Sequence, residues 1–178
     1  MFISNEGSIR VVVLLLLLVL GVGLTLYAFS SKDTIKQPIE FNHKKHIQEN
    51  SMTCVDCHKY AEKDYLASIP NIEVCGLCHS EDTMPEDTTA KEKVSKVVDY
   101  VAKKEQIPWQ RLYQLDDHIY FSHRRHTVFG KIACEKCHGD MGSQSSPPPS
   151  PLMALSMDDC INCHLDRKAS VDCIGCHK

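Results

Sequence analysis

Every cysteine of this chain lies in one short motif that occurs five times. The chain has 178 residues and ten cysteines, and each motif reads Cys-x-x-Cys-His. The cysteine pairs are Cys54 and Cys57, Cys75 and Cys78, Cys134 and Cys137, Cys160 and Cys163, and Cys173 and Cys176. The histidines that complete the motifs are His58, His79, His138, His164 and His177. Because five motifs crowd a short chain, we expect folding to be coupled to whatever these motifs bind.

The motif is the attachment sequence of c-type haem, in which both thiols form thioether bonds and the histidine binds the iron. Cys-x-x-Cys pairs also build zinc sites and disulfides. The histidine argues for haem, because ten histidines in 178 residues would follow all five pairs by chance with a probability of about one in a million. The sequence therefore predicts five covalently attached haems, with zinc or disulfides as the alternative.

One further histidine is present for each predicted iron. These are His43, His46, His118, His123 and His126. An iron with two imidazole ligands is six-coordinate and leaves no open position for a substrate. We predict that all five are distal ligands. The alternative is that methionine, Met157 or Met52, replaces histidine at one iron and raises the reduction potential of that haem.

The N-terminal region contains one long uncharged run, residues 11–29. As a helix rising ~1.5 Å per residue it would span about 28 Å, close to the ~30 Å of a bilayer core. We predict a transmembrane helix there, between a cytoplasmic tail over 1–10 and a polar stalk over 31–40. A cleaved signal peptide ending near Ser30 is the alternative.

The expected location follows from the haem motifs. Lysines after the uncharged run would by themselves favour a cytoplasmic C-terminal part. Haem is attached on the exported side, however, so we expect residues 31–178 to lie there. The sequence thus predicts a single-pass protein of the cytoplasmic (inner) membrane with a periplasmic haem domain.

An internal repeat divides the remainder of the chain. Phe41-Asn42-His43-Lys44-Lys45-His46 recurs as Phe121-Ser122-His123-Arg124-Arg125-His126, and eight positions separate the last histidine from the next motif in both copies. Histidines at i and i+3 of a helical turn are displaced along its axis, so the two rings can serve different irons. We predict a dihaem module over 41–79 and a trihaem module over 118–178.

The linker over 80–117 contains an amphipathic pattern. Four valines, Val94, Val97, Val98 and Val101, recur at helical spacing. Thr88 or Thr89 could cap the start of this helix, and Pro108 is expected to end it. The formal net charge of −3 gives no sign of nucleic-acid binding. The predicted fold is mainly α with low regular secondary structure.

The repeated Phe-x-His-x-x-His element followed by Cys-x-x-Cys-His resembles the cytochrome c3/c7 superfamily. The resemblance implies a cytochrome c3/c7-like multihaem domain, in which the first histidine serves the haem of the next motif and the second serves a later haem. It assigns His43 to the haem at Cys54, His123 to the haem at Cys134 and His126 to the haem at Cys173. The irons of His46 and His118, and the distal ligand at Cys160, stay open.

The order of an anchor, a dihaem module, Pro108-Trp109-Gln110-Arg111 and a trihaem module resembles the pentahaem, membrane-anchored cytochrome c subunits of alternative complex III. That resemblance implies an iron–sulfur subunit related to molybdopterin oxidoreductases, polytopic quinol-binding membrane subunits and a monohaem cytochrome c as partners. Related subunits of menaquinone reductase complexes carry six haems, whereas five motifs are present here.

The predicted function is electron relay within a quinol:acceptor oxidoreductase complex, with no catalysis by this chain on its own. A self-sufficient membrane quinol dehydrogenase is one alternative. The uncharged helix has no acidic residue or histidine to accept protons from a quinol, which argues against it. A multihaem reductase is the other, and it would need an iron with a vacant distal position.

Overall fold

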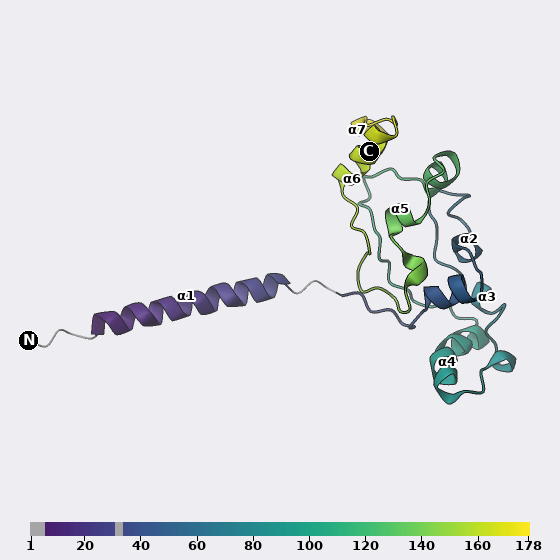
Figure 1. The fold of residues 1–178 in the computed structure, drawn as a ribbon, viewed down its shortest axis with the longest axis horizontal. Coiled ribbons are helices and arrows are strands. Elements are labelled where there is room, and N and C mark those ends of the chain that lie inside the picture. The colour runs from purple at the N-terminus through teal and green to yellow at the C-terminus, as the bar shows by residue number, and fades with distance from the viewer. Residues whose placement is uncertain (1–5, 31–33) are drawn as a thin grey trace, which may run out of the picture. The chain divides into compact units, whose positions relative to one another are not determined.

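The computed structural model describes residues 6–30 and 34–178, and the side chains of residues 6, 8 and 26–30 lie outside this description. The chain divides into two units, Met1–Thr34 and Ile35–Lys178. The first unit holds helix α1, Glu6–Ser30 (Figure 1). Leucine-rich sequence without proline favours this helix, which includes the helix predicted over 11–29.

The membrane placement of this segment is a separate matter. Within the described residues, no helix is long and apolar enough to cross a membrane. The structure therefore does not support the transmembrane helix predicted over 11–29. Residues 1–5 of the predicted tail and 31–33 of the predicted stalk lie outside the described residues.

The second unit is built from short helical pieces joined by loops. Its α-helices are α2 (Cys54–Cys57), α3 (Ile72–Cys75), α4 (Thr88–Lys103), α5 (Glu135–His138), α6 (Met157–Asp166) and α7 (Cys173–Cys176). Its π-helical turns are η1 (Lys45–Glu49) and η3 (Arg125–Phe129), and its 3-10 turns are η2 (Glu81–Thr83) and η4 (Met141–Ser143). A single bridge between Ile119 and His177 is the extended pairing in the described part of the chain. The unit is thus mainly helical with little regular structure, as predicted.

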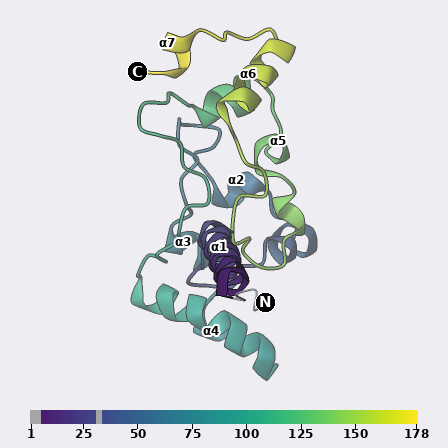
Figure 2. The ribbon, with the colours of Figure 1, turned by 90° about the vertical axis from the view of Figure 1, so that its left-hand side faces the viewer.

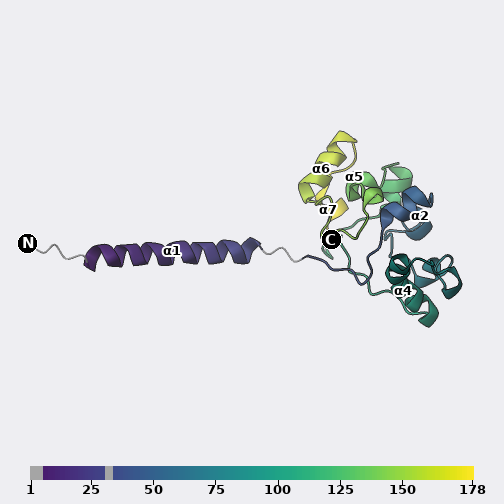
Figure 3. The same cartoon turned by 60° about the horizontal axis from the view of Figure 1, so that its bottom comes forward.

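These helices follow one another along the unit. Helices α3 and α4 lie at one end, α2 and α5 in the middle, and α6 and α7 at the other end (Figure 2). A third view again places α6 and α7 together and away from α4 (Figure 3). The haem motifs are therefore spread from one end of the unit to the other.

Helix α4 is the longest helix of this unit, and it is capped by Asp87 rather than by the predicted Thr88 or Thr89. The Asp87 side chain accepts a hydrogen bond from the Ala90 backbone N–H at 2.8 Å and so caps the helix. The helix ends well before Pro108, because Lys104 adopts a left-handed conformation (φ 55°). Its apolar face packs inward, with Val98 buried.

The protein buries few of its own apolar side chains. In the described residues these are Ile39, Ala61, Ile72, Val98 and Ile107. Three of them, Ile39, Ile72 and Ile107, form one cluster against which Cys75, Val97, Tyr100, Val101 and Trp109 pack. This small cluster holds α3 against α4 and leaves the other motifs without an apolar core of polypeptide.

The sequence repeat is also a structural repeat, offset by 80 residues. Phe41 stacks on His46 with ring centroids 4.4 Å apart and planes at 20°. Phe121 stacks on His126 at 4.6 Å and 23°. In each copy the phenylalanine also meets the first histidine edge-on, at 4.7 Å and 4.9 Å. Each phenylalanine thus fixes two imidazoles in nearly perpendicular orientations.

Each copy of the repeat supports the histidine-bearing turn of the other copy, which is η1 in the first copy and η3 in the second. We call η1 and η3 the histidine turns. After the first motif, the Asp64 carbonyl accepts a hydrogen bond from the Arg124 backbone N–H at 3.0 Å. After the third motif, the Gln144 carbonyl accepts one from the Lys44 backbone N–H at 3.0 Å. Asp64 and Gln144 are 80 residues apart, as are Lys44 and Arg124. The predicted modules therefore interlock within one unit, and each supplies the support for the other's histidine turn.

Candidate functional site

Each Cys-x-x-Cys-His motif includes a helical turn, which at Cys160 is part of the longer helix α6 and at Cys75 follows α3, and this turn places the three functional side chains on one face. The backbone N–H of His58 donates to the Cys54 carbonyl at 2.8 Å, and that of His138 donates to the Cys134 carbonyl at 3.0 Å. Residues at i, i+3 and i+4 of such a turn are neighbours. The ten cysteines form no disulfides with one another. Both thiols and the imidazole of a motif are therefore available to one ligand.

The structure brings the ten histidines together in pairs, each with one motif histidine and one further histidine. The distances between ring centroids are 6.1 Å for His46 and His79, 6.3 Å for His123 and His138, 6.1 Å for His126 and His164, and 5.3 Å for His118 and His177. The remaining two histidines, His43 and His58, form the fifth pair, since His58 lies near enough to contribute to the lowered pKa of His43. We call each motif with its partner histidine a site, named by its first cysteine.

The ring separations fit a metal ion between two imidazoles. Two imidazoles bound on opposite sides of one metal ion through bonds of about 2 Å have ring centroids about 6 Å apart. The pairs at 6.1 Å and 6.3 Å match this spacing, and the pair at the Cys173 site is somewhat closer. In the described residues, no three or more His, Cys, Asp or Glu side chains gather as a metal-ion cage. The donor sets are therefore facing pairs.

Five of the ten histidine rings form a hydrogen bond through Nδ1, which leaves Nε2 free to bind a metal. The Nδ1 atoms of His46, His58, His123, His126 and His164 each lie 2.5–3.0 Å from a backbone carbonyl oxygen. A carbonyl oxygen can only accept, so Nδ1 carries the proton and Nε2 keeps its lone pair. This arrangement is the usual support for a metal-binding histidine.

Burial lowers the pKa of three of the paired imidazoles and so favours the neutral form that metal binding requires. Burial, with smaller contributions from the nearby His58 and His46, lowers the pKa of His43 from 6.5 to about 4. Burial also lowers the pKa of His79 and of His138. These rings are unprotonated at neutral pH and can donate a lone pair.

The Cys75, Cys54 and Cys134 sites are neighbours in space, because thiols of adjacent sites lie near one another. Burial raises the pKa of the Cys75 thiol, and the nearby Cys57 raises it further. Burial likewise raises the pKa of Cys134 to about 11, with Cys54 as the next cause. The Cys54 site therefore lies between the Cys75 site and the Cys134 site.

The last three sites are linked in the same way. Burial raises the pKa of Cys137, and Cys163 adds to it. Burial raises the pKa of Cys160 as well, with contributions from Asp159, Cys137 and Cys176 in that order. In space the sites run in the order Cys75, Cys54, Cys134, Cys160 and Cys173, which matches the succession of helices in Figure 2. We call this spatial series of five sites the row. Its order differs from the order of the motifs along the sequence.

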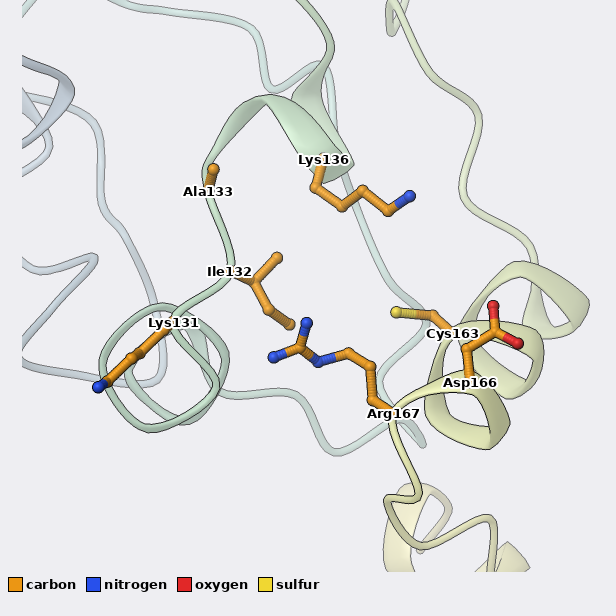
Figure 4. Close-up of a pocket in the computed structure, with 7 residues that line it drawn as sticks. All are labelled: Lys131, Ile132, Ala133, Lys136, Cys163, Asp166 and Arg167. Atoms are coloured by element: carbon orange, nitrogen blue, oxygen red, sulfur yellow. The ribbon is translucent and has the colours of Figure 1, made fainter.

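A cavity of about 380 Å³ lies at the Cys160 site (Figure 4). Its lining residues come from the segments 131–136 and 163–167, and the Cys163 sulfur points toward the space between Lys136 and Arg167. The volume is in the range of about 300–1,000 Å³ that is usual for small-molecule and cofactor sites. The two cations could pair with the carboxylates of a porphyrin.

The pairing differs from one assignment that the superfamily resemblance implies. His126 lies against His164 of the Cys160 site, whereas the resemblance assigns it to the haem at Cys173. His118 takes the place beside His177. The partners of His43 and His123 agree with the resemblance. Every motif histidine has a histidine nearby, which favours histidine over the alternatives Met157 and Met52 as a distal ligand; the ligand set stays a prediction.

The sequence did not reveal which carbonyls support the rings. His123 is held by the Tyr65 carbonyl, which accepts hydrogen bonds from both its ring Nδ1 and its backbone N–H at 3.0 Å. Any residue type can supply a carbonyl, so composition carries no signal for it. The other copy has no counterpart of this contact, because the Nδ1 atom of His43 has no hydrogen-bond partner among the described residues.

Comparison with known proteins gives two matches. Residues 39–97 and 119–178 match the family described as cytochrome c7 and related cytochrome c. The chain is also 27% identical over 166 residues to the multiheme cytochrome c subunit of menaquinone reductase from Nitratidesulfovibrio vulgaris. That alignment covers 80% of this chain and 77% of the relative. The family match includes the motifs at both ends of the row.

Proposed function

The chain belongs to the family of cytochrome c7 and related cytochrome c, and we propose that it is an electron relay carrying five haems within a quinone-linked oxidoreductase complex. The family implies covalently bound c-type haem. The observation that carries the relay is the row of five histidine pairs that runs from one end of the second unit to the other. When bound, haem supplies reversible one-electron chemistry at its iron.

The protein's own residues hold the haems and exclude other ligands. The ten motif cysteines attach the porphyrins through thioether bonds, and the motif histidines bind one side of each iron. The distal ligands are His43 at the Cys54 site, His46 at the Cys75 site, His123 at the Cys134 site, His126 at the Cys160 site and His118 at the Cys173 site. Histidines on both sides of each bound haem would leave no room for a substrate at the iron, which argues against a multihaem reductase.

The two ends of the row are the places where electrons enter and leave. One end is the Cys75 site, which packs with α4 through the cluster around Ile72. The other end is the Cys173 site, whose first cysteine is exposed. Between them the Cys54 and Cys134 sites join the two copies of the repeat. An electron that crosses the unit passes that junction.

The membrane and the partners are part of the proposal. The apolar side chains of α1 between Ile9 and Leu24 are exposed, and a bilayer would cover them. We place the haem unit on the exported side, in the periplasm. The relative's name supports a complex of the menaquinone reductase type. The five motifs favour the alternative complex III type, with an iron–sulfur subunit, polytopic quinol-binding subunits and a monohaem cytochrome c.

Purification from membranes in mild detergent tests this function. We expect the chain to co-purify with polytopic subunits, and a soluble menaquinol analogue to reduce its haems in that complex. The isolated chain should be reduced by a strong chemical reductant but not by the quinol, because the uncharged run over 11–29 has no acidic residue or histidine to accept the protons of a quinol. Visible absorbance of the haems reports both reactions. Equal quinol reduction of the isolated chain would support a self-sufficient quinol dehydrogenase instead.

A further inference from the structure

The hydrogen bonds that support the imidazoles are distributed unevenly over the five sites. At the Cys160 site both rings have one: His126 Nδ1 donates to the Ser122 carbonyl at 2.8 Å, and His164 Nδ1 donates to the Ser170 carbonyl at 2.5 Å. At the Cys173 site neither His118 nor His177 has a ring hydrogen bond among the described residues. The sites thus range from two supported rings to none.

The three other sites are intermediate, because one ring of each is supported. The supported rings are those of His46, His58 and His123. The first histidines of the two repeat copies differ in this support. His123 donates to the Tyr65 carbonyl, whereas the Nδ1 atom of its counterpart His43 is buried without a partner in the described residues.

A hydrogen bond from Nδ1–H to a carbonyl makes the imidazole a more basic ligand. A more basic ligand stabilises the oxidised, more positive iron and so lowers the reduction potential. Hydrogen bonding around the ligands is one of the main means by which proteins set this potential. The number of supported rings should therefore rank the five sites.

We infer that the Cys160 site has the lowest reduction potential of the row and the Cys173 site the highest. This ranking rests on the proposed function in one respect, namely that the sites hold haem. It places the steepest potential difference between two adjacent sites at the α6–α7 end. An electron leaving the row at this end gains most of its driving force in the last transfer.

The Cys160 and Cys173 sites resemble each other around their first cysteines. Cys160 and Cys173 are both exposed. Each is preceded by an aspartate that accepts a hydrogen bond from a serine hydroxyl, Asp159 at 2.6 Å and Asp172 at 2.9 Å. The nearest acidic charge therefore does not separate the two sites, whereas the ring hydrogen bonds of His126 and His164 do.

Two ligand substitutions in the full chain test the ranking. Methionine in place of a distal histidine keeps the iron six-coordinate and raises its potential. In a potentiometric titration followed by visible absorbance, His126→Met should shift the lowest-potential component upward, and His118→Met should shift the highest. The remaining components should keep their positions. A shift of any other component by either variant would overturn the ranking.

A measurement on the unsubstituted protein covers the case in which a variant does not assemble. In ¹⁵N-histidine-labelled chain, the Nδ1 protons of His126 and His164 should exchange slowly with solvent, and those of His118 and His177 quickly. Comparable exchange at all four rings would contradict the inference. Both measurements are independent of quinol reduction and of co-purifying subunits. A wrong ranking is therefore distinguishable from a wrong assignment of the relay.

Discussion

The His126→Ala variant is expected to convert one of five iron centres from low-spin to high-spin. The His126 ring faces that of His164 at 6.1 Å, so removing it vacates one axial position at the Cys160 site. Alanine cannot bind a metal, and a haem with one imidazole and an open side is high-spin or binds water weakly. Electron paramagnetic resonance of the oxidised protein should show one fifth of the haem as high-spin signal.

Backgrounds that lack one haem identify which iron His126 serves. In Cys160→Ser/Cys163→Ser the haem at the Cys160 site cannot be attached, and adding His126→Ala should then create no high-spin iron. In the matched Cys173→Ser/Cys176→Ser background the same substitution should still create one. The reverse result would favour the assignment that the superfamily resemblance implies and contradict the pairing in the structure.

Ile72→Ala is expected to cost about 2–5 kcal/mol of the free energy of unfolding. Ile72 is 3% exposed and packs with Ile39 and Ile107. Since this cluster joins α3 to α4, a cavity there loosens both. Its backbone N–H also donates to the Gln106 side chain at 3.0 Å, which ties the start of α3 to the segment after α4. Denaturant unfolding followed by circular dichroism measures the loss.

The same substitution at an exposed position is the control. Ile174 is 87% exposed, so Ile174→Ala should change the free energy of unfolding by no more than about 0.5 kcal/mol. Cys75 packs against the Ile72 cluster. During denaturation of Ile72→Ala, the haem at the Cys75 site should therefore become disordered before the haems at the other four sites. Equal stability of the two variants would mean that this cluster does not stabilise the unit.

The motifs made much of the site predictable from sequence. Cys-x-x-Cys-His fixes its own geometry, because residues at i, i+3 and i+4 share a face of any helical turn. The repeat predicted that His43 and His46 would serve different partners, since a spacing of three residues displaces the two rings. The valines of α4 predicted its buried face. These features depend on local geometry alone.

What could not be predicted depends on how distant segments meet. The partner of His126 is set by where α6 lies relative to η3, and no local pattern encodes that placement. The reciprocal support of the two histidine turns by the Asp64 and Gln144 carbonyls was hidden for the same reason. The end of α4 was predicted too late, because the left-handed Lys104 stops the helix without a glycine.

The mass of the intact mature chain tests the central claim most directly. Five thioether-linked haems predict the polypeptide mass plus five haem groups, retained under denaturing conditions because the bonds are covalent. Loss of the added mass on denaturation would indicate bound zinc instead. A decrease of two hydrogens for each cysteine pair would indicate disulfides, and either result would contradict the relay.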